Sequence, residues 1–496
     1  MGEASVAERG EDRFETVIGL EVHAQLLTRS KMYCGCSSRY ADAAPNTHVC
    51  PVCAGLPGAL PAINRAAVEA TILTGLALGS EVPGFCKLDR KNYVYPDLPK
   101  GYQISQYDLP LCVGGALEFA IAGESRRAGI TRVHIEEDTG RLVHRADDLG
   151  GEVSLVDLNR SGVPLMEIVG EPDLRSPAEA RVYLETLRQL LRHVGVSTGN
   201  MEEGAFRCDA NVSVRAVGGP LGAKVEVKNM NSFRAVERAL RFEEDRQRRR
   251  LDRGEVIEQE TRGWIEERGV TVGQRTKEQA HDYRYFPEPD LPPLVVSAEM
   301  VAAIRRRLPE LPAARRARLT ERYGLGGAEV AIMTEERAVA DLFEAVVGPT
   351  GTPERARLAA NWIVNDLLGL ARQRGLPPDQ VPFDAVQLGD LLDALATGAL
   401  TPRAAKELLP QVEEGERPSA AAARLGLLAL DDEAAVRTAV VEAMAANPTV
   451  VADLRGGKQA AIGRLIGESI KRTGGRAKPD QVRRLIEEAL AASSTG

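Results

Sequence analysis

The sequence lacks any run of apolar residues close to the roughly 18 that a membrane-spanning helix requires. Its first residues also lack the order of a signal peptide, in which positive charge precedes an apolar run. Instead, this segment is acidic, with Glu3, Glu8, Glu11 and Asp12. We therefore predict a cytoplasmic protein with no membrane partner.

An excess of positive charge is absent as well. The 63 Lys and Arg residues stand against 71 Asp and Glu residues, which gives a formal net charge of -8. Any nucleic acid would therefore have to bind a local basic surface.

Neither the Walker G-x-x-x-x-G-K-[ST] loop nor the dinucleotide-binding G-x-G-x-x-G motif is present. A bound nucleotide is thus predicted to lie on a different kind of scaffold from a P-loop or Rossmann site.

Seven cysteines, an odd number in a long chain without a secretion signal, do not indicate a disulfide framework. Four of them form a C-x-C pair followed by a C-x-x-C pair, which is close to zinc-ribbon spacing: Cys34, Cys36, Cys50 and Cys53. Four thiolates would leave no open coordination position, so we predict a structural Zn²⁺, with free thiols or a redox pair as alternatives. The remaining cysteines are predicted to be buried thiols: Cys86, Cys112 and Cys208.

The 496 residues favour about three domains, at roughly 150 residues each. Short β-type segments with Gly turns occupy residues 14–286, and prolines then cluster at Pro287, Pro289, Pro292 and Pro293. Beyond this cluster, Ala, Leu, Arg and Glu recur at helical spacing. We predict an α+β fold with an antiparallel-sheet domain at 14–294, an all-helical domain at 295–408 and a small helical tail domain at 409–496.

One helix in the first domain is predicted in detail. Ser176 can cap its N-terminus, Pro177 suits its first turn, Glu179 would complete a capping box, and Gly195 would end it. Its apolar stripe predicts packing against the core. The residues of this stripe are Leu184, Leu187, Leu191 and Val194.

Strand alternation predicts a sheet with one polar face. In residues 16–26 it places Leu20 and Val22 on one side and Glu21 and His23 on the other. Four further segments, at 132–138, 164–169, 207–214 and 224–229, repeat this pattern. Their polar groups are His134, Glu136, Asp138, Glu167, Asp209, Asn211, Ser213, Lys224, Glu226 and Lys228.

A polar face on one strand is typical of a half-solvated antiparallel sheet. Carboxylates, imidazoles, Asn and Lys on five strands favour a metal-dependent phosphoryl-transfer site, because Mg²⁺ takes hard oxygen ligands and keeps several waters.

Residues 89–107 mix tyrosines with Asp89, Lys91, Asp97 and Lys100. Their Pro and Gly residues predict a loop that is either structural or covers a substrate.

Seven segments together resemble the B subunits of the bacterial tRNA-dependent amidotransferases. They are VIGLEVHAQL, DRKNYVYPDLPKGYQISQ, ITRVHIEEDTGRL, SLVDLNRSGVPLMEIV, MEEGAFRCDANVSVR, VKNMNSF and DYRYFPEPDLPPL, which follow in the family's order. The similarity runs from Phe14 to about Leu490. The related archaeal E subunits carry a large inserted domain that this sequence lacks, which favours the bacterial type.

The resemblance implies a cradle domain related in fold to glutamine synthetase, followed by a helical domain and a helical tail. It implies that ATP and Mg²⁺ serve to phosphorylate the side-chain carboxylate of Glu-tRNA(Gln) or Asp-tRNA(Asn). Ammonia from the family's glutaminase, the A subunit, would then form the amide, and a small C subunit would complete a heterotrimer.

The resemblance also implies a set of metal and phosphorylation residues, which falls on Glu21, His23, Glu137, Glu167 and Asp209. Four of these belong to the predicted polar face. Strict alternation would point Glu136 and not Glu137 to that face, so either a bulge intervenes or the ligand is Glu136. Lys228 and Asn229, in the VKNMNSF segment, are weaker candidates for contacts with ATP or phosphate.

The tail is locally basic, in contrast to the whole chain. A charged run is often a solvated helix face, but a local reversal of charge favours a phosphate-backbone partner. The predicted tRNA-binding residues are Arg455, Lys458, Arg464, Lys471, Arg472, Arg476 and Lys478. Two other functions remain open at this point: a non-catalytic, zinc-bearing tRNA-binding or assembly protein, and a stand-alone carboxylate-amine ligase that acts on a free small substrate.

Overall fold

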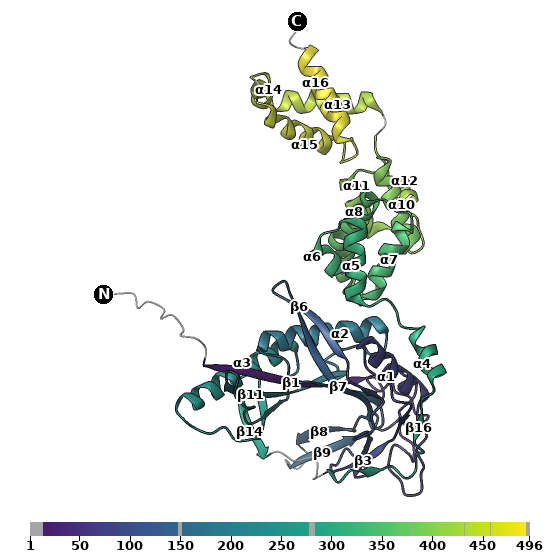
Figure 1. The fold of residues 1–496 in the computed structure, drawn as a ribbon. Helices are drawn as coiled ribbons and strands as arrows, with labels where there is room; N and C mark the ends of the chain where they lie inside the picture. The colour runs from purple at the N-terminus through teal and green to yellow at the C-terminus, as the bar shows by residue number, and fades with distance from the viewer. Residues whose placement is uncertain are drawn as a thin grey trace, which may run out of the picture. The chain divides into compact units, whose positions relative to one another are not determined.

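The computed structural model describes residues 13–146, 151–276, 283–377, 379–430, 432–456 and 458–492 (Figure 1). The chain divides into two compact units, Met1–Leu311 and Pro312–Gly496. The acidic residues Glu3, Glu8, Glu11 and Asp12 lie outside the described residues.

The first unit is built on a sheet to which nine of the described strands belong, in the order β14-β13-β12-β11-β1-β10-β7-β5, with β6 paired to β7. All pairs in this sheet are antiparallel except β12 with β13, which are parallel. The predicted antiparallel sheet is therefore confirmed with one exception. The strands are β1 (Phe14–Gln25), β5 (Cys112–Val113), β6 (Ala116–Ile121), β7 (Glu124–Glu137), β10 (Pro164–Gly170), β11 (Phe206–Ala216), β12 (Val225–Lys228), β13 (Glu260–Ile265) and β14 (Val270–Thr276).

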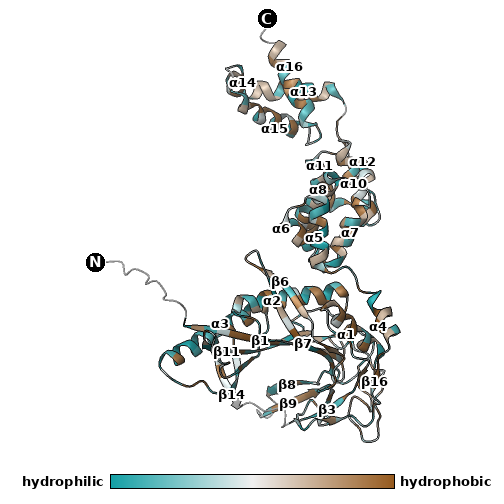
Figure 2. Cartoon of the chain, viewed as in Figure 1, coloured by the Kyte–Doolittle hydropathy of each residue, from teal (hydrophilic) through white to brown (hydrophobic). Residues whose placement is uncertain are grey.

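Three helices cover one face of this sheet (Figure 1). They are α1 (Arg65–Ala77), α2 (Pro177–Val194) and α3 (Phe233–Asp252), and their buried side chains form one hydrophobic core with the apolar face of the strands. The alternation predicted for β1 is confirmed, because Leu20 and Val22 are buried in this core. α3 is largely hydrophilic apart from its inner face (Figure 2). The opposite face of the sheet keeps its polar side chains.

The helix predicted at 177–194 is confirmed as α2, with Ser176 as its N-cap and Gly195 as a left-handed C-cap. The Ser176 side chain accepts a hydrogen bond from the backbone N–H of Glu179. The predicted capping box is wrong in one respect. The Glu179 carboxylate accepts its bond from the N–H of Arg175, one residue before the cap.

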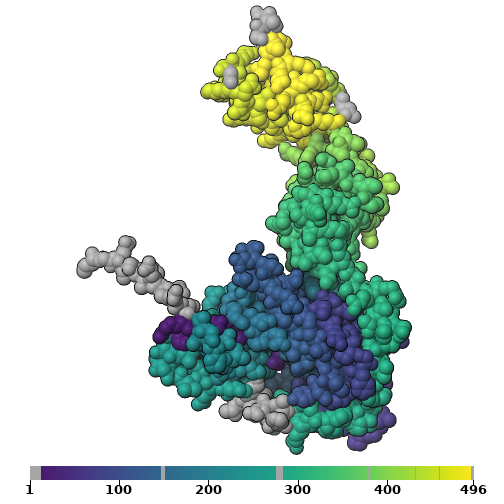
Figure 3. All heavy atoms as spheres, viewed as in Figure 1, coloured from purple at the N-terminus to yellow at the C-terminus, as the bar shows by residue number. Residues whose placement is uncertain are grey.

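The hairpin of β6 and β7 projects from the surface of the first unit (Figures 1 and 3). Ile121 pairs with Glu124, so only Ala122 and Gly123 form the connection. Both have positive φ angles, of 51° and 84°. A two-residue hairpin connection of this kind twists in the same sense as the strands it joins.

Residues 89–107, predicted as a loop, include two short antiparallel strands, β3 (Asp89–Asn92) and β4 (Tyr102–Ser105). The alternation in these strands is too short to be distinguished from loop sequence, and residues 93–101 between them contain the Pro and Gly residues. Smaller pairings complete the described part of this unit. They join β15 (Phe286–Pro287) to β3, β16 (Leu294–Val295) to β2 (Phe85–Cys86), and β8 (Arg141–Ala146) to β9 (Glu152–Asp157).

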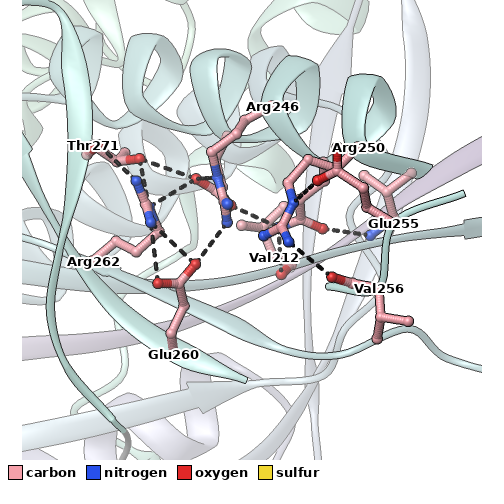
Figure 4. A network of polar contacts seen from close by, with 11 residues as sticks. Val212, Arg246, Arg250, Glu255, Val256, Glu260, Arg262 and Thr271 are labelled. Carbon is pink, nitrogen blue, oxygen red and sulfur yellow. Dashed lines mark hydrogen bonds and ion pairs between the residues drawn. The ribbon is translucent and has the colours of Figure 1, made fainter. Parts of the chain in front are cut away.

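A buried polar network fixes α3 to β13 and β14 (Figure 4). The fully buried carboxylate of Glu243 lies 2.6 Å from Arg246 Nη2 and 3.4 Å from Arg262 Nε. Glu260 bridges the same two guanidinium groups at 2.9 and 3.1 Å. Thr271 Oγ1 donates a hydrogen bond of 3.0 Å to Glu243. The connection between the two parallel strands is thus held by charge pairs inside the fold.

The first unit extends past the predicted boundary at residue 294. Helix α4 (Ala298–Arg305) packs against α1, and its Ile304 side chain is buried in the core of the sheet unit. The contact boundary accordingly falls after Leu311. The proline cluster therefore marks the end of the strands and not the end of the unit.

The second unit is helical throughout its described residues, as predicted. None of the described helices in the chain is both long and apolar enough to cross a membrane. The helices of this unit are α5 (Pro312–Tyr323), α6 (Gly327–Met333), α7 (Arg337–Val347), α8 (Pro353–Trp362), α9 (Leu368–Gln373), α10 (Ala385–Ala396), α11 (Pro402–Leu408), α12 (Pro418–Arg424), α13 (Glu433–Ala446), α14 (Pro448–Arg455), α15 (Ile462–Arg472) and α16 (Pro479–Ala492).

This unit holds two hydrophobic cores. One extends from Leu319 to Ala422 and the other from Val436 to Ile486. The predicted tail domain began at residue 409, but α12 contributes Ala421 and Ala422 to the earlier core. The tail core therefore begins later, with α13, because the small side chains of α12 fit between the helices that precede it.

Candidate active site and cysteine cluster

The polar face of the sheet brings together His23, His134, Glu136 and Glu167. His23 on β1 lies opposite Glu167 on β10, and Glu167 lies opposite His134 on β7. Glu136 follows two residues after His134, on the same face. One ligand atom from each of His23, Glu136 and Glu167 lies within 4.8 Å of the others. This donor set, with two carboxylates and one imidazole, fits a divalent cation.

The four side chains interact directly. The Nε2 atom of His134 lies 3.2 Å from Glu167 Oε2 and 3.6 Å from Glu136 Oε1, and His23 Nε2 lies 3.5 Å from Glu167 Oε2. Glu136 and His134 are each only 2% exposed. The buried Nδ1 atom of His134 has no hydrogen-bond partner among the described residues. The cluster is thus enclosed and has unused capacity for polar contacts.

The electrostatics of this cluster keep its carboxylates ionised. Burial alone would lower the pKa of His134, but the charges of Glu167 and Glu136 raise it to about 9. Burial alone would raise the pKa of Glu167, yet His134 and His23 hold it well below its usual range. Burial alone would raise the pKa of Glu136 too, but the charge of Lys91 and the hydrogen bond and charge of His134 together lower it. Ionised oxygens are the form that binds a cation.

Glu136 is held in place by β3 and β4. Ser105 Oγ donates a hydrogen bond of 2.7 Å to its carboxylate, Gln103 Nε2 donates one of 3.0 Å, and Lys91 Nζ lies at 3.5 Å. Sequence reasoning did not identify these contacts, because it interpreted residues 89–107 as a loop. Lys91 was the only visible signal among them, as a cation in that stretch.

Glu137 lies on the other side of β7. Its carboxylate pairs with Lys100 and accepts a hydrogen bond of 3.0 Å from the N–H of Ile104. The register of β7 with β10 is regular from residue 133 to 137. The structure therefore contains no bulge there, and it places Glu136, not Glu137, beside His23 and Glu167.

Glu21 and Asp209 face each other on β1 and β11. Glu21 Oε1 accepts a hydrogen bond of 2.8 Å from Asn211 Nδ2, and Asp209 Oδ2 lies 2.6 Å from Lys228 Nζ. Asn229, with a positive φ of 65°, follows at the end of β12. A cleft of about 410 Å³ joins this group to the first cluster, and its lining includes His23, Lys91, Glu136, Asp209, Lys228 and Asn229.

Arg207 and Asp138 also line this cleft. Arg207 Nη2 lies 2.8 Å from the buried carboxylate of Asp138, which also accepts a hydrogen bond of 2.7 Å from Gln25. Strand alternation predicts Asp138 on the polar face but gives it no function, and the sequence pattern did not identify Arg207. The Asp138 carboxylate thus fixes the position of the Arg207 guanidinium group at the wall of the cleft.

The cysteine cluster forms as predicted. The Sγ atoms of Cys34, Cys36, Cys50 and Cys53 all lie within 4.8 Å of one another. Zn–S bonds of about 2.3 Å in a tetrahedron would require sulfur separations of about 3.8 Å, and Cys50 and Cys53 are 3.9 Å apart. The hydrogen bond from Cys34 lowers the pKa of Cys53 to about 4, while burial raises that of Cys36 to about 11.

The three other cysteines are buried, as predicted, at 0 to 3% exposure. Burial raises the pKa of Cys86 to about 11 and that of Cys112 to about 12. These thiols belong to the hydrophobic core.

Two known protein domains match this chain. The GatB/GatE catalytic domain matches residues 16–302, and the GatB domain matches residues 341–490. The chain belongs to the GatB/GatE family. The family resemblance predicted from the sequence motifs is confirmed.

Relatives of this GatB/GatE chain align over nearly its full length. A protein of Thermomicrobium roseum is 60% identical over 479 residues, with 96% of this chain and 99% of the relative covered. Proteins of Moorella thermoacetica and Dehalococcoides mccartyi are 53% and 50% identical, with 96% of this chain and 100% and 99% of the relatives covered. Each of the three is named as the B subunit of an aspartyl/glutamyl-tRNA(Asn/Gln) amidotransferase.

The basic residues of the GatB domain differ in their surroundings. Arg455, Arg464 and Lys471 are exposed and form no ion pair within the described chain. Lys458 pairs with Asp453 at 2.9 Å and Arg472 with Glu442 at 3.2 Å. The predicted tRNA-binding set also includes two half-buried residues. Arg476 donates hydrogen bonds to the carbonyl oxygens of Thr473 and Gly426, and Lys478 also has a partner.

Proposed function

We propose that this chain is the component of a tRNA-dependent amidotransferase that activates the side-chain carboxylate of Glu-tRNA(Gln) or Asp-tRNA(Asn) with ATP. Amidation by ammonia would then yield Gln-tRNA(Gln) or Asn-tRNA(Asn). The observation that carries this proposal is the enclosed cluster of His23, Glu136 and Glu167 within the family's catalytic domain. The names of the relatives support the substrate class.

The residues of the cleft fit the chemistry of phosphoryl transfer. His23, Glu136 and Glu167 would hold one Mg²⁺, and Glu21 with Asp209 would bind a further metal or its waters. The metal neutralises phosphate charge when ATP is bound, so catalysis there consists mostly of positioning and electrostatic stabilisation. Lys91, Lys228 and Asn229 would orient the phosphates, and Arg207 would add a fixed positive charge.

The carboxylate of the substrate itself attacks the γ-phosphorus atom of ATP, and ADP leaves as the bond from that phosphorus to the bridging oxygen breaks, so this chain needs no nucleophile of its own. The resulting acyl phosphate hydrolyses readily, so water must be excluded from the cleft. We propose that the glutaminase of the complex, its A subunit, supplies the ammonia, and that a small C subunit completes a cytoplasmic heterotrimer. The first unit would be a cradle related in fold to glutamine synthetase.

Two further parts of the chain would serve binding and stability. The cysteine cluster fits one Zn²⁺ with no open coordination position, so this metal would be structural. The basic residues of the tail would contact the tRNA backbone, where Lys and Arg neutralise phosphates without reading the bases. Arg455, Arg464 and Lys471 are the best placed for this role, because their charges are not already paired within the described residues.

The experiment that tests the proposal combines the chain with its two partner proteins, ATP, glutamine and Glu-tRNA(Gln). Formation of Gln-tRNA(Gln) that stops when Asp209→Asn replaces the native chain is the expected result. Unchanged amidation by this variant would instead favour a non-catalytic binding role. Amidation of free glutamate at the rate of the tRNA substrate would favour a stand-alone ligase.

A further inference from the structure

Lys31 is a completely buried lysine that the proposed reaction does not use. It follows β1, and its relative exposure is 0%. A buried ammonium group is costly to the fold unless charge and hydrogen bonds compensate it. The surroundings of Lys31 therefore show what compensates its charge.

The Nζ atom of Lys31 has three partners. The carbonyl oxygen of His48 lies at 2.8 Å, that of Leu158 at 3.3 Å, and the Sγ atom of Cys53 at 3.5 Å. These partners account for the three N–H donors of an ammonium group. Among the residues that the structure describes, no carboxylate lies within ion-pair distance of Lys31. Within that part of the chain, the sulfur of Cys53 is thus the only partner of Lys31 that can carry a negative charge.

The segment that carries the cluster is also bound to the segment before β10. Asn46 Oδ1 accepts a hydrogen bond of 2.8 Å from the N–H of Leu158, and Asn159 Oδ1 accepts one of 2.8 Å from the N–H of His48. Ser161 Oγ donates a bond of 3.1 Å to the carbonyl oxygen of Cys53. Side chains from both segments take part, so each segment orders the other. We call residues 156–161 the docked segment.

We propose that Lys31 is the built-in counter-ion of the cysteine cluster and couples its metal to the docked segment. This inference rests on the proposed zinc site and is independent of the ligase reaction. Four thiolates around Zn²⁺ carry a net charge of −2, which one buried ammonium group partly neutralises. Because the same group binds the carbonyl oxygen of Leu158, a change at the metal is transmitted to the docked segment and to β10, which carries Glu167.

The test uses the zinc-loaded full chain and follows zinc release to an excess of a chromogenic chelator. We expect Lys31→Met to release zinc at least about tenfold faster than the native chain, since outer partners of metal ligands typically contribute 10–100-fold to affinity. Lys31→Arg keeps the charge and should remain within about threefold of the native rate. Lys87→Met is the matched control, because Lys87 pairs with Asp89 and Asp108, outside the cluster.

Hydrogen exchange of the native chain gives a second readout, which does not depend on whether any variant folds. Removal of zinc should speed amide exchange in the docked segment at least about tenfold and leave α2 unchanged. The proposal would be overturned if Lys31→Met released zinc at the native rate, or if Lys87→Met accelerated zinc release as much as Lys31→Met does. It would also be overturned if removal of zinc left amide exchange in the docked segment unchanged. A native chain without zinc by elemental analysis would overturn both the zinc site and this role of Lys31, and would leave the ligase assignment untouched.

Discussion

Glu136 and Glu137 are neighbours in the sequence but occupy different environments. Glu136 shares the polar face with His23 and Glu167, whereas Glu137 pairs with Lys100 on the other side of β7. Both are 2% exposed, so burial alone does not separate them. The difference arises from strand geometry, in which successive side chains point to opposite faces. It can be tested directly by substitution.

We expect Glu136→Gln to lower kcat for amidation at least about 100-fold and to raise the Mg²⁺ concentration needed for half-maximal activity, because a metal ligand loses its charge. The measurement is Gln-tRNA(Gln) formation by the assembled complex at a series of Mg²⁺ concentrations. Glu118→Gln, an exposed carboxylate on β6, controls for the change of charge. Amidation by Glu136→Gln at the native rate and native Mg²⁺ requirement would remove Glu136 from the site.

Cys34→Ser should reduce bound zinc from about one ion per chain to near zero and lower Tm by several degrees. A structural metal contributes its binding free energy to folding, and a hydroxyl is a much weaker ligand than a thiolate. Elemental analysis and thermal denaturation measure the two effects. Cys86→Ala, which alters a core cysteine outside the cluster, should retain the zinc. A native chain that contains no zinc, and whose Tm equals that of Cys34→Ser, would contradict this prediction.

The positions of several candidate site residues could be predicted from local pattern alone. Alternation placed His23, Glu167 and Asp209 on one face, and the C-x-C and C-x-x-C spacing predicted a cysteine cluster that the structure assembles. The residues that hold Glu136 could not be predicted. Gln103 and Ser105 reach it only because β4 folds over β7 from more than 30 positions away in the sequence. No local periodicity carries such a contact.

At the scale of elements, α3 depends on the buried carboxylate of Glu243. Its two guanidinium partners, Arg246 and Arg262, come from different elements. We expect Glu243→Gln to lower the free energy of unfolding by about 2 kcal/mol, because the buried hydrogen bonds and ion pairs with Arg246 and Arg262 lose their negative charge and only Glu260 remains to neutralise both cations. Denaturant titration measures this change. Glu124→Gln, which affects an exposed pair with Arg126, should leave the midpoint nearly unchanged; equal midpoints for both variants would contradict the prediction.

Elements with strong local signals could be predicted closely, and elements defined by partners could not. The ends of α2 follow from Ser176, Pro177 and Gly195, which act within one helical turn. The parallel pairing of β12 with β13 had no local signal, because the sequence of a four-residue strand does not specify its neighbour. The same reason explains why α4 was placed in the wrong unit. Its membership depends on contact with α1, far earlier in the chain.

At the scale of the whole molecule, we expect the unpaired cations of the tail to set the salt dependence of tRNA binding. Replacing Arg455, Arg464 and Lys471 together by Gln should reduce the log–log salt slope by about 2, at roughly 0.7 per lost phosphate contact. The Km for tRNA should rise while kcat at saturating tRNA changes little, since these residues are distant in sequence from the proposed catalytic carboxylates. Affinity measured across a range of salt concentrations tests this.

The matched control replaces Lys458, Arg472 and Arg484, each of which is already paired within the tail. Its slope should change by less than that of the first variant, because an internally paired cation releases fewer counterions on binding. Equal slopes for both variants and the native chain would show that the tail is a solvated helical appendage.

The central position of β1 has a consequence for synthesis on the ribosome. This strand leaves the exit tunnel well before its two neighbours in the sheet, β10 and β11, which end at Gly170 and Ala216. At roughly 5–20 residues per second, about 10 to 40 seconds pass before the last of its partners exists. During that time Ile18, Leu20 and Val22 have no finished sheet to enter. The nascent chain therefore exposes an apolar strand to which chaperones can bind. We expect any product that terminates before β11 to be degraded by proteases.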